Sequence, residues 1–284
     1  MRRRAVLRAL ASCALAAGGL SGCDAVRERL TLVAERGHGC VDVPVPAAAG
    51  VHVERAAFES EHVRGPVGYA LVVPDDVRVD AFAYVLPGRG STAAAAGVLR
   101  FDAFLAELLR RGARPFGLAI VDAGESYFHP RASGEDRLAM VTEELPRVVR
   151  DAIGRPVKRE AIVGQSMGGY GALLAAERAP GRYRAVAVAG PAIFPSYADE
   201  SRSVGDAFDS AADYAAHDVV AHAGALRGRP VMIAVGRRDP FLPGVRMFAR
   251  ACPTARVVER PGCHDDGFWR ASAASLLSFV AGHL

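Results

Sequence analysis

Short apolar runs alternate with amphipathic segments along most of the chain. The runs 51–58, 68–73 and 80–86 are rich in β-forming residues and separated by turn residues, which predicts an antiparallel hairpin leading into a sheet. Beyond them, strand-like and helix-like patterns alternate, as in a parallel sheet with helices on both faces. Further strands are predicted at 116–121, 161–163, 185–189, 231–235 and 256–259, and helices at 98–108, 137–152, 166–178, 242–251 and 267–281.

These patterns predict one α/β domain over residues 51–284, with about eight strands in a mostly parallel sheet. The interval 191–229 breaks the alternation, because Ser, Asp and Ala dominate it and its helical spacing is confined to about 204–226. It is too long for a simple connection between elements. We expect a small helical cap inserted over the edge of the sheet that carries the active site.

The first 22 residues have the pattern of an export signal. A basic stretch (1–8) precedes an apolar run (9–20) that is too short to cross a bilayer as a helix. The run ends in Leu20-Ser21-Gly22-Cys23, which resembles a bacterial lipobox, whose cysteine becomes the lipidated first residue of the mature protein. We expect a signal peptide at 1–22 and a lipidated Cys23 with a tether at 23–50, with an ordinary signal peptide as the alternative.

Such a protein would be held outside the cytoplasmic membrane by its lipid anchor alone. Arg3-Arg4 is also similar to a twin-arginine export signal, although an arginine-rich leader explains it almost as well. Export permits a disulfide. The length of the strand between Cys252 and Cys263 argues against that pair, and pairing of Cys40 with either of them stays open.

The charge balance indicates no nucleic-acid partner. The chain has 35 basic and 31 acidic residues, but four of the arginines lie in the first 22 residues, where there is no acid. The remainder is balanced and has no basic stripe. No phosphate-binding loop, dinucleotide fingerprint or metal cluster is recognisable; His217 and His222, for example, are five residues apart, which does not place them on one helix face. We expect neither a cofactor nor a metal.

The segment Gly164-Gln165-Ser166-Met167-Gly168 stands between the strand at 161–163 and a helix rich in Ala and Leu. A G-x-S-x-G motif alone is common, but a strand, a sharp turn and a helix are the context in which it carries a nucleophilic serine. Ser166 would need a strained backbone, and its glycine neighbours supply the room. The helix N-terminus beneath it favours developing negative charge. Ser166 is therefore the candidate nucleophile.

A nucleophilic serine needs a base, and the base needs a group that orients it. Asp239 follows the strand at 231–235 and His264 follows the strand at 256–259, so both lie at the edge where such sheets bind ligands. The order Ser, Asp, His is the one expected in this architecture. The sequence thus predicts a Ser166–His264–Asp239 triad; the alternatives are a turn residue at Asp239 and a helix-capping neighbour at His264.

An oxyanion formed at Ser166 needs two backbone N–H donors. We expect Met167 to supply one and the loop 86–90 to supply the other, from the Arg89 amide or, as second choice, from Gly90. His129 follows the strand at 116–121 on the same edge. It would contact substrate there or pack within its own loop.

These motifs resemble the α/β-hydrolase superfamily and, within it, the "Putative esterase" group, which includes S-formylglutathione hydrolases, feruloyl esterases and secreted mycolyltransferases. The resemblance covers roughly residues 66 to 284. It is carried by the segment 164–173, the turn Asp239-Pro240-Phe241, and Gly262-Cys263-His264-Asp265 ahead of Phe268-Trp269. One departure is Pro87-Gly88, where many relatives have His-Gly.

The resemblance implies an α/β-hydrolase fold, the same triad, and a substrate pocket lined by the loop from Tyr127 to Pro130. Substrate contacts are expected from residues in or beside the matching motifs, namely Gly90, Gln165, Tyr127, His129, Phe241 and Trp269. The leading hypothesis is a lipid-anchored serine hydrolase that cleaves carboxylic esters of small molecules, lipids or carbohydrates. An acyltransferase with a carbohydrate acceptor would use the same residues, and a non-catalytic lipoprotein on a hydrolase scaffold is the third interpretation.

Overall fold

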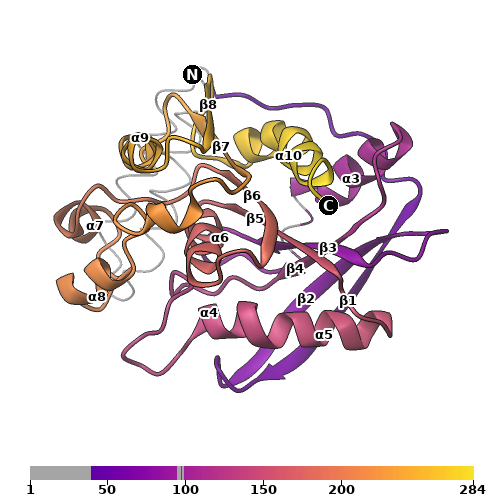
Figure 1. Cartoon of the computed structure of the whole chain (residues 1–284), viewed down its shortest axis with the longest axis horizontal. Helices are drawn as coiled ribbons and strands as arrows, with labels where there is room; N and C mark the ends of the chain where they lie inside the picture. Colours follow the sequence, from indigo (N-terminus) through magenta and orange to yellow (C-terminus); the bar gives the residue numbers. More distant parts are fainter. Residues whose placement is uncertain (1–39, 95–96, 98) are drawn as a thin grey trace, which may run out of the picture. The chain divides into compact units, whose positions relative to one another are not determined.

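The computed structural model describes residues 40–94, 97 and 99–284, of which Val41–Leu284 form one compact unit. This unit contains an eight-stranded sheet with the order β1-β2-β4-β3-β5-β6-β7-β8 (Figure 1). The strands are β1 (Val51–Ser60), β2 (Gly65–Pro74), β3 (Ala81–Leu86), β4 (Gly117–Val121), β5 (Arg159–Gln165), β6 (Tyr183–Ala189), β7 (Val231–Gly236) and β8 (Arg256–Arg260). Strand β2 is antiparallel to β1 and β4, and the remaining neighbours are parallel. The predicted hairpin and mostly parallel sheet are confirmed.

Helices cover both faces of the sheet. The main ones are α3 (Phe101–Arg110), α5 (Leu145–Ile153), α6 (Met167–Arg178), α9 (Leu242–Ala251) and α10 (Asp266–Ala281). Helices α3 and α10 share a hydrophobic core with one face, and α5, α6 and α9 share a second core with the other (Figure 1). Every residue of β3, β4 and β7 is buried between these layers, which explains their uninterrupted apolar sequences.

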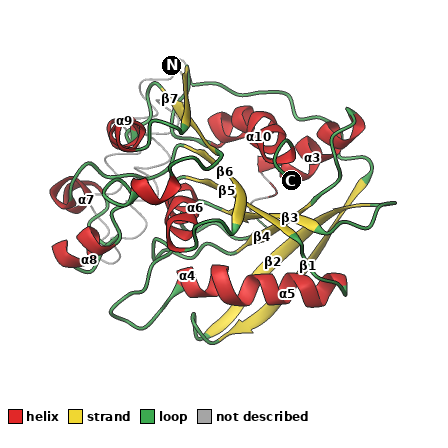
Figure 2. Ribbon diagram, viewed as in Figure 1, coloured by secondary structure: helices red, strands yellow, loops and turns green. Residues whose placement is uncertain are grey.

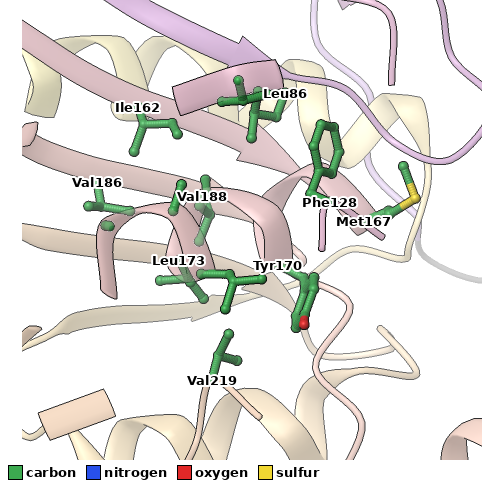
Figure 3. Close-up of a cluster of buried hydrophobic side chains, with 14 of the residues drawn as sticks. Leu86, Phe128, Ile162, Met167, Tyr170, Leu173, Val186, Val188 and Val219 are labelled. Atoms are coloured by element: carbon green, nitrogen blue, oxygen red, sulfur yellow. The ribbon is translucent and has the colours of Figure 1, made fainter. Parts of the chain in front are cut away.

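Helix α6 lies within the larger of the two cores. Its Met167, Tyr170 and Leu173 pack in one cluster with side chains from the sheet, from the loop after β4 and from the segment after β6 (Figure 3). The helix starts directly after β5, which lies between β3 and β6. The turn from β5 to α6 is therefore flanked by the loops that leave β3 and β6 at the same edge.

The helix predicted at 137–152 forms in three parts. A short α4 (Arg137–Ala139) is followed by a π-helical turn η3 (Met140–Glu144) and then by α5. Pro146 lies in the first turn of α5, where a missing N–H is tolerated, so the proline divides the helix without ending it. Buried Glu144 in η3 accepts hydrogen bonds from the Ser60 hydroxyl (2.5 Å) and the Glu61 N–H (2.9 Å), which fastens the β1–β2 hairpin to this helix.

The interval 191–229 is helical, as expected for a cap. It contains α7 (Tyr197–Ser203), α8 (Ala211–Ala216) and the 3-10 turn η4 (Ala223–Leu226), joined by loops (Figure 2). Ser196 and Ser210 cap the N-termini of α7 and α8 with their side-chain oxygens. Phe194, Phe208 and Val219 pack into the core that contains α6. We refer to residues 191–229 as the cap.

The segment before β1 packs on the compact unit. Val41 and Val43, which fall within the expected tether at 23–50, pack against the core beneath α10, and Asp42 forms an ion pair with Arg270 (2.8 Å). A side chain at Gly267 would collide with the carbonyl oxygen of Val41. Part of the expected tether thus packs on the compact unit Val41–Leu284, because these two valines are partly buried against its core. The predicted signal peptide at 1–22 and Cys23 lie outside the described residues.

The bonding state of the described cysteines excludes some of the disulfide pairings that the sequence left open. Cys252 is a free, buried thiol, whereas Cys40 and Cys263 are each disulfide-bonded. Pairings that involve Cys252 are therefore excluded. In the described part of the chain, none of the helices combines the length and hydropathy needed to span a bilayer.

Candidate active site

Ser166 lies at the sharp turn from β5 to α6. Its backbone has φ 55° and ψ −124°, a conformation that non-glycine residues rarely adopt. The turn is held by hydrogen bonds from the Ser166 N–H to the Ala189 carbonyl (3.1 Å) and from the Ala192 N–H to the Ser166 carbonyl (2.9 Å). A side chain at Gly168 would collide with the carbonyl oxygen of Leu86. The turn at Ser166 is therefore as crowded as the sequence predicted, and the absence of a side chain at Gly168 avoids a steric clash there.

The side chains of Ser166, His264 and Asp239 form one hydrogen-bonded series. Ser166 Oγ lies 2.8 Å from His264 Nε2, and His264 Nδ1 lies 2.9 Å from Asp239 Oδ2. The Asp239 carboxylate is completely buried, and its Oδ1 accepts a hydrogen bond from the Phe241 N–H (2.9 Å). The structure thus brings together three residues that follow β5, β7 and β8.

Aromatic rings flank His264. Phe241 approaches it with ring centroids 5.0 Å apart, and Trp269 meets it edge to face at 5.3 Å. The buried Trp269 Nε1 has no hydrogen-bond partner among the described residues. Two of the predicted substrate-contact residues therefore lie beside the imidazole. Gln165, a third, is almost fully buried at the end of β5.

The loop after β3 runs against Ser166. A Cβ atom on Gly88 would stand 3.5 Å from the Cβ of Ser166. The Gly90 N–H donates to the carbonyl of Gly124 (2.7 Å), so it is already engaged. Within residues 40–94, 97 and 99–284, the N–H groups of Arg89 and Met167 have no acceptor. Of the amides considered from sequence, these two are the ones available to a bound oxyanion.

Tyr127 and Phe128 hold the loop after β4 in an unusual conformation. Both have positive φ angles, 55° and 52°, although neither is glycine. The Tyr127 ring lies 5.9 Å from that of Tyr170 and 5.8 Å from that of Phe194. Tyr127 is buried, and this burial raises the pKa of its hydroxyl. Tyr127 therefore packs between this loop and the cap.

His129 does not face a surface from which a substrate could reach it. Its ring is fully buried, with Nε2 2.8 Å from the Ala207 carbonyl and Nδ1 3.0 Å from the Pro130 carbonyl. Burial lowers the pKa of this imidazole. Of the two roles that the sequence left open, the structure has His129 packed beneath the cap.

Gly190 is a site residue that the sequence patterns missed. It follows β6 with φ +50°, and a Cβ atom on it would stand 2.5 Å from Asp239 Oδ2 and 3.2 Å from His264 Nδ1. A glycine between a strand and Pro191 was a signal for a special backbone position. Nothing in the local sequence linked that position to Asp239 and His264.

The chain is similar to known esterases in sequence and in fold. A family model described as "Putative esterase" matches residues 115–271, more than half of the chain. The chain is 39% identical over 108 residues to the S-formylglutathione hydrolase of Paracoccus denitrificans (strain Pd 1222), covering 36% of this chain and 38% of that protein. It is 29% identical over 125 residues to the mouse S-formylglutathione hydrolase, covering 41% of this chain and 44% of the mouse protein. The match thus spans less than half the length of these relatives.

The fold is also found in solved esterase structures. A ferulic acid esterase superposes with a TM-score of 0.72 at 18% sequence identity, covering 82% of this chain and 99% of that one. The eight-stranded sheet with helices on both faces is thus an α/β-hydrolase fold. Given the extent of the family match, the chain belongs to the "Putative esterase" family.

Proposed function

We propose that the protein hydrolyses carboxylic esters outside the cytoplasmic membrane, with Ser166 as nucleophile, His264 as general base and acid, and Asp239 as the group that orients His264. The observation that carries the proposal is the continuous hydrogen-bonded series from Ser166 through His264 to Asp239. The strained turn supports it further, because it holds the hydroxyl of Ser166 clear of the β5 strand and toward His264.

The first half-reaction forms an acyl-enzyme. Ser166 Oγ attacks the ester carbonyl carbon while His264 Nε2 takes the hydroxyl proton. The tetrahedral intermediate then collapses, and the leaving alkoxide receives that proton from His264. Asp239 stays ionised and accepts the hydrogen bond from Nδ1–H, which keeps the imidazole in the tautomer that presents its Nε2 lone pair to Ser166.

The second half-reaction repeats these steps with water. His264 Nε2 takes a proton from a water molecule, whose oxygen attacks the acyl carbon, and the Ser166 oxygen then leaves and regains the proton. In both steps the backbone N–H groups of Met167 and Arg89 donate to the oxyanion, and the N-terminus of α6 adds its positive potential. The two amides support this role because neither is used elsewhere in the described structure.

The location is the other part of the proposal. The Leu20-Ser21-Gly22-Cys23 pattern favours lipidation of Cys23 and anchoring at the membrane surface. Disulfide-bonded Cys263 supports an oxidising compartment. In a bacterial host, the unchanged protein should sediment with membranes, and Cys23→Ser should release it. Equal sedimentation of both proteins would argue against the anchor.

Turnover of p-nitrophenyl acetate tests the catalytic assignment. Ser166→Ala should lower kcat/KM by about a thousandfold or more, since loss of a triad nucleophile costs several powers of ten. Ser133→Ala, in an exposed loop position, is the matched control and should keep full activity. Equal rates for Ser166→Ala and the unchanged protein would contradict the assignment. With a carbohydrate present, a carbohydrate ester as the main product would instead identify an acyltransferase.

A further inference from the structure

Three side chains able to bind a metal meet where the loop after β4 contacts the cap. They are His129 from the loop, Asp213 from α8 and His217 at the C-terminal end of α8, and one ligand atom of each lies within 4.8 Å of the other two. Nδ1 of His129 and Nδ1 of His217 lie 3.7 Å and 2.9 Å from the same Asp213 oxygen, Oδ1. The two imidazole rings stack with centroids 4.7 Å apart. We call these three residues the loop–cap cluster.

A neutral His129 ring has too few N–H groups for the acceptor oxygens that face it. Both of its nitrogens face backbone carbonyl oxygens, Nε2 that of Ala207 at 2.8 Å and Nδ1 that of Pro130 at 3.0 Å. A neutral imidazole carries one N–H and one lone pair, and the shorter distance favours Nε2–H donating to Ala207. The Nδ1 lone pair then faces the Pro130 carbonyl and the Asp213 carboxylate. A cation placed among these atoms converts their repulsion into attraction.

The neighbouring groups already hold the ligand atoms in place. Donation from His129 Nε2–H to a backbone carbonyl is the usual arrangement for a metal-bound histidine, because it fixes the tautomer and orients the ring. Asp213 Oδ2 accepts the Asp209 N–H (2.8 Å), which leaves Oδ1 directed toward the two imidazoles. His129 is fully buried, and the side chains of Asp213 and His217 are only 15% and 13% exposed.

We propose that the loop–cap cluster binds one Zn²⁺ ion through a nitrogen of each of His129 and His217 and through Oδ1 of Asp213, with the Pro130 carbonyl oxygen as the fourth ligand. The two separations from Asp213 Oδ1, 2.9 and 3.7 Å, bracket the spacing of about 3.3 Å between ligands bonded at about 2.0–2.1 Å to tetrahedral zinc. Two imidazoles with one carboxylate suit Zn²⁺, whereas Mg²⁺ and Ca²⁺ favour sites made of oxygen ligands alone.

The ion fastens the loop after β4 to the cap. Tyr127, two residues before His129, lies beside Phe208 of the cap (ring centroids 6.3 Å apart), and the His129 ring stacks on Phe208 at 5.0 Å. Binding therefore orders two segments that border the triad, and it stabilises the folded protein by mass action. This proposal does not depend on the hydrolysis of esters, since none of its ligands belongs to the triad.

The test is a Zn²⁺ titration of the purified protein after treatment with EDTA and dialysis. In competition with a chromogenic chelator, we expect one Zn²⁺ per chain, a rise in Tm with ZnCl2, and neither effect with MgCl2. His217→Asn should weaken Zn²⁺ binding at least about tenfold. The matched control is His222→Asn, at an exposed position just beyond α8, which should bind Zn²⁺ as the unchanged protein does. Asp213→Asn, which keeps the side-chain size, replaces His217→Asn if that variant does not fold.

Cobalt gives a readout that does not depend on stability. Co²⁺ at this site should give visible absorption bands of a four-coordinate complex, which His217→Asn should abolish and His222→Asn should keep. The proposal is overturned if the unchanged protein binds no Zn²⁺, or if His217→Asn and Asp213→Asn both bind it with unchanged affinity. It is also overturned if NMR shows that His129 is an imidazolium that excludes Zn²⁺, because a proton would then supply the positive charge.

Discussion

Gly190 lies so close to Asp239 that a Cβ atom on it would stand 2.5 Å from Oδ2, the oxygen that faces His264 Nδ1. Gly190 is held there by its own N–H, which donates to the carbonyl of Ala234 in the neighbouring strand β7 (2.8 Å). The backbone at the end of β6 thus forms one wall of the space occupied by the acid and the base. A larger residue cannot enter without moving one of these two side chains.

We therefore predict that Gly190→Ala lowers kcat/KM by about a hundredfold, because a shift of about 1 Å in a catalytic group has effects of this size. Gly228→Ala is the matched control: Gly228 also has a positive φ, +74°, but nothing lies within 4 Å of a Cβ atom there. Gly228→Ala should lose a similar amount of stability through backbone strain but keep full activity. The measurement is p-nitrophenyl acetate kinetics on folded proteins, and similar losses in both variants would refute the steric explanation.

Glu177 makes the stability of the fold dependent on pH. It is buried in α6, and neither carboxylate oxygen has a hydrogen-bond partner among the described residues. Burial raises the pKa of Glu177 from 4.5 to about 9. Between these values the unfolded chain releases a proton that the folded protein keeps, so stability falls as the pH rises, by at most about 1.4 kcal/mol per pH unit.

Glu177→Gln should remove this dependence, because the amide carries no titratable proton. The variant should match the unchanged protein in Tm near pH 4.5 and exceed it increasingly toward pH 8, as measured by thermal unfolding at a series of pH values. Glu59→Gln, at an exposed position of β1, should change Tm little throughout. A Tm difference for Glu177→Gln that stays constant with pH would show that the carboxyl is already ionised in the folded state.

The side chain of Arg89 ties the proposed oxyanion loop to the cap. Its guanidinium donates to Asp206 Oδ2 at 2.7 Å, and both side chains are partly exposed. Loss of such a pair should cost less than about 1 kcal/mol of stability.

Arg89→Ala should nevertheless lower kcat about three- to tenfold at unchanged KM, because the Arg89 N–H loses its fixed position and the oxyanion loses part of one donor. Arg110→Ala, which removes an exposed ion pair on α3, is the control and should be fully active. Steady-state kinetics distinguish the outcomes. A rise in KM at constant kcat would mean that the Arg89 side chain binds substrate instead.

The three residues of the proposed triad could be selected from sequence because each carries a local signal. Ser166 has a strand before it and a helix after it, and Asp239 and His264 directly follow strands. In a parallel sheet the carboxyl ends of strands share one edge, so local assignments were enough to place all three there. The boundaries of β3, β4 and β7 were predicted to within one residue, since burial on both faces produces uninterrupted apolar runs.

Other features depend on packing between distant segments and leave no local pattern. The approach of Gly190 to Asp239 requires the order of β6 and β7 in the sheet, which apolar runs do not specify. For His129 the position of its strand end left substrate contact and packing in the loop equally open, and only the fold shows that the cap covers its ring. His217 was set aside because His222 does not share its helix face, whereas its partner His129 is far away in sequence.

The identity of the nucleophile is the central claim, and covalent labelling tests it most directly. The protein is treated with a fluorophosphonate probe, digested, and the modified peptide is sequenced by mass spectrometry. We predict a single adduct on the oxygen of Ser166, formed slowly or not at all in His264→Ala, because the hydroxyl then has no base. An adduct on a different residue, or a folded protein that hydrolyses p-nitrophenyl acetate without any label on Ser166, would contradict the account.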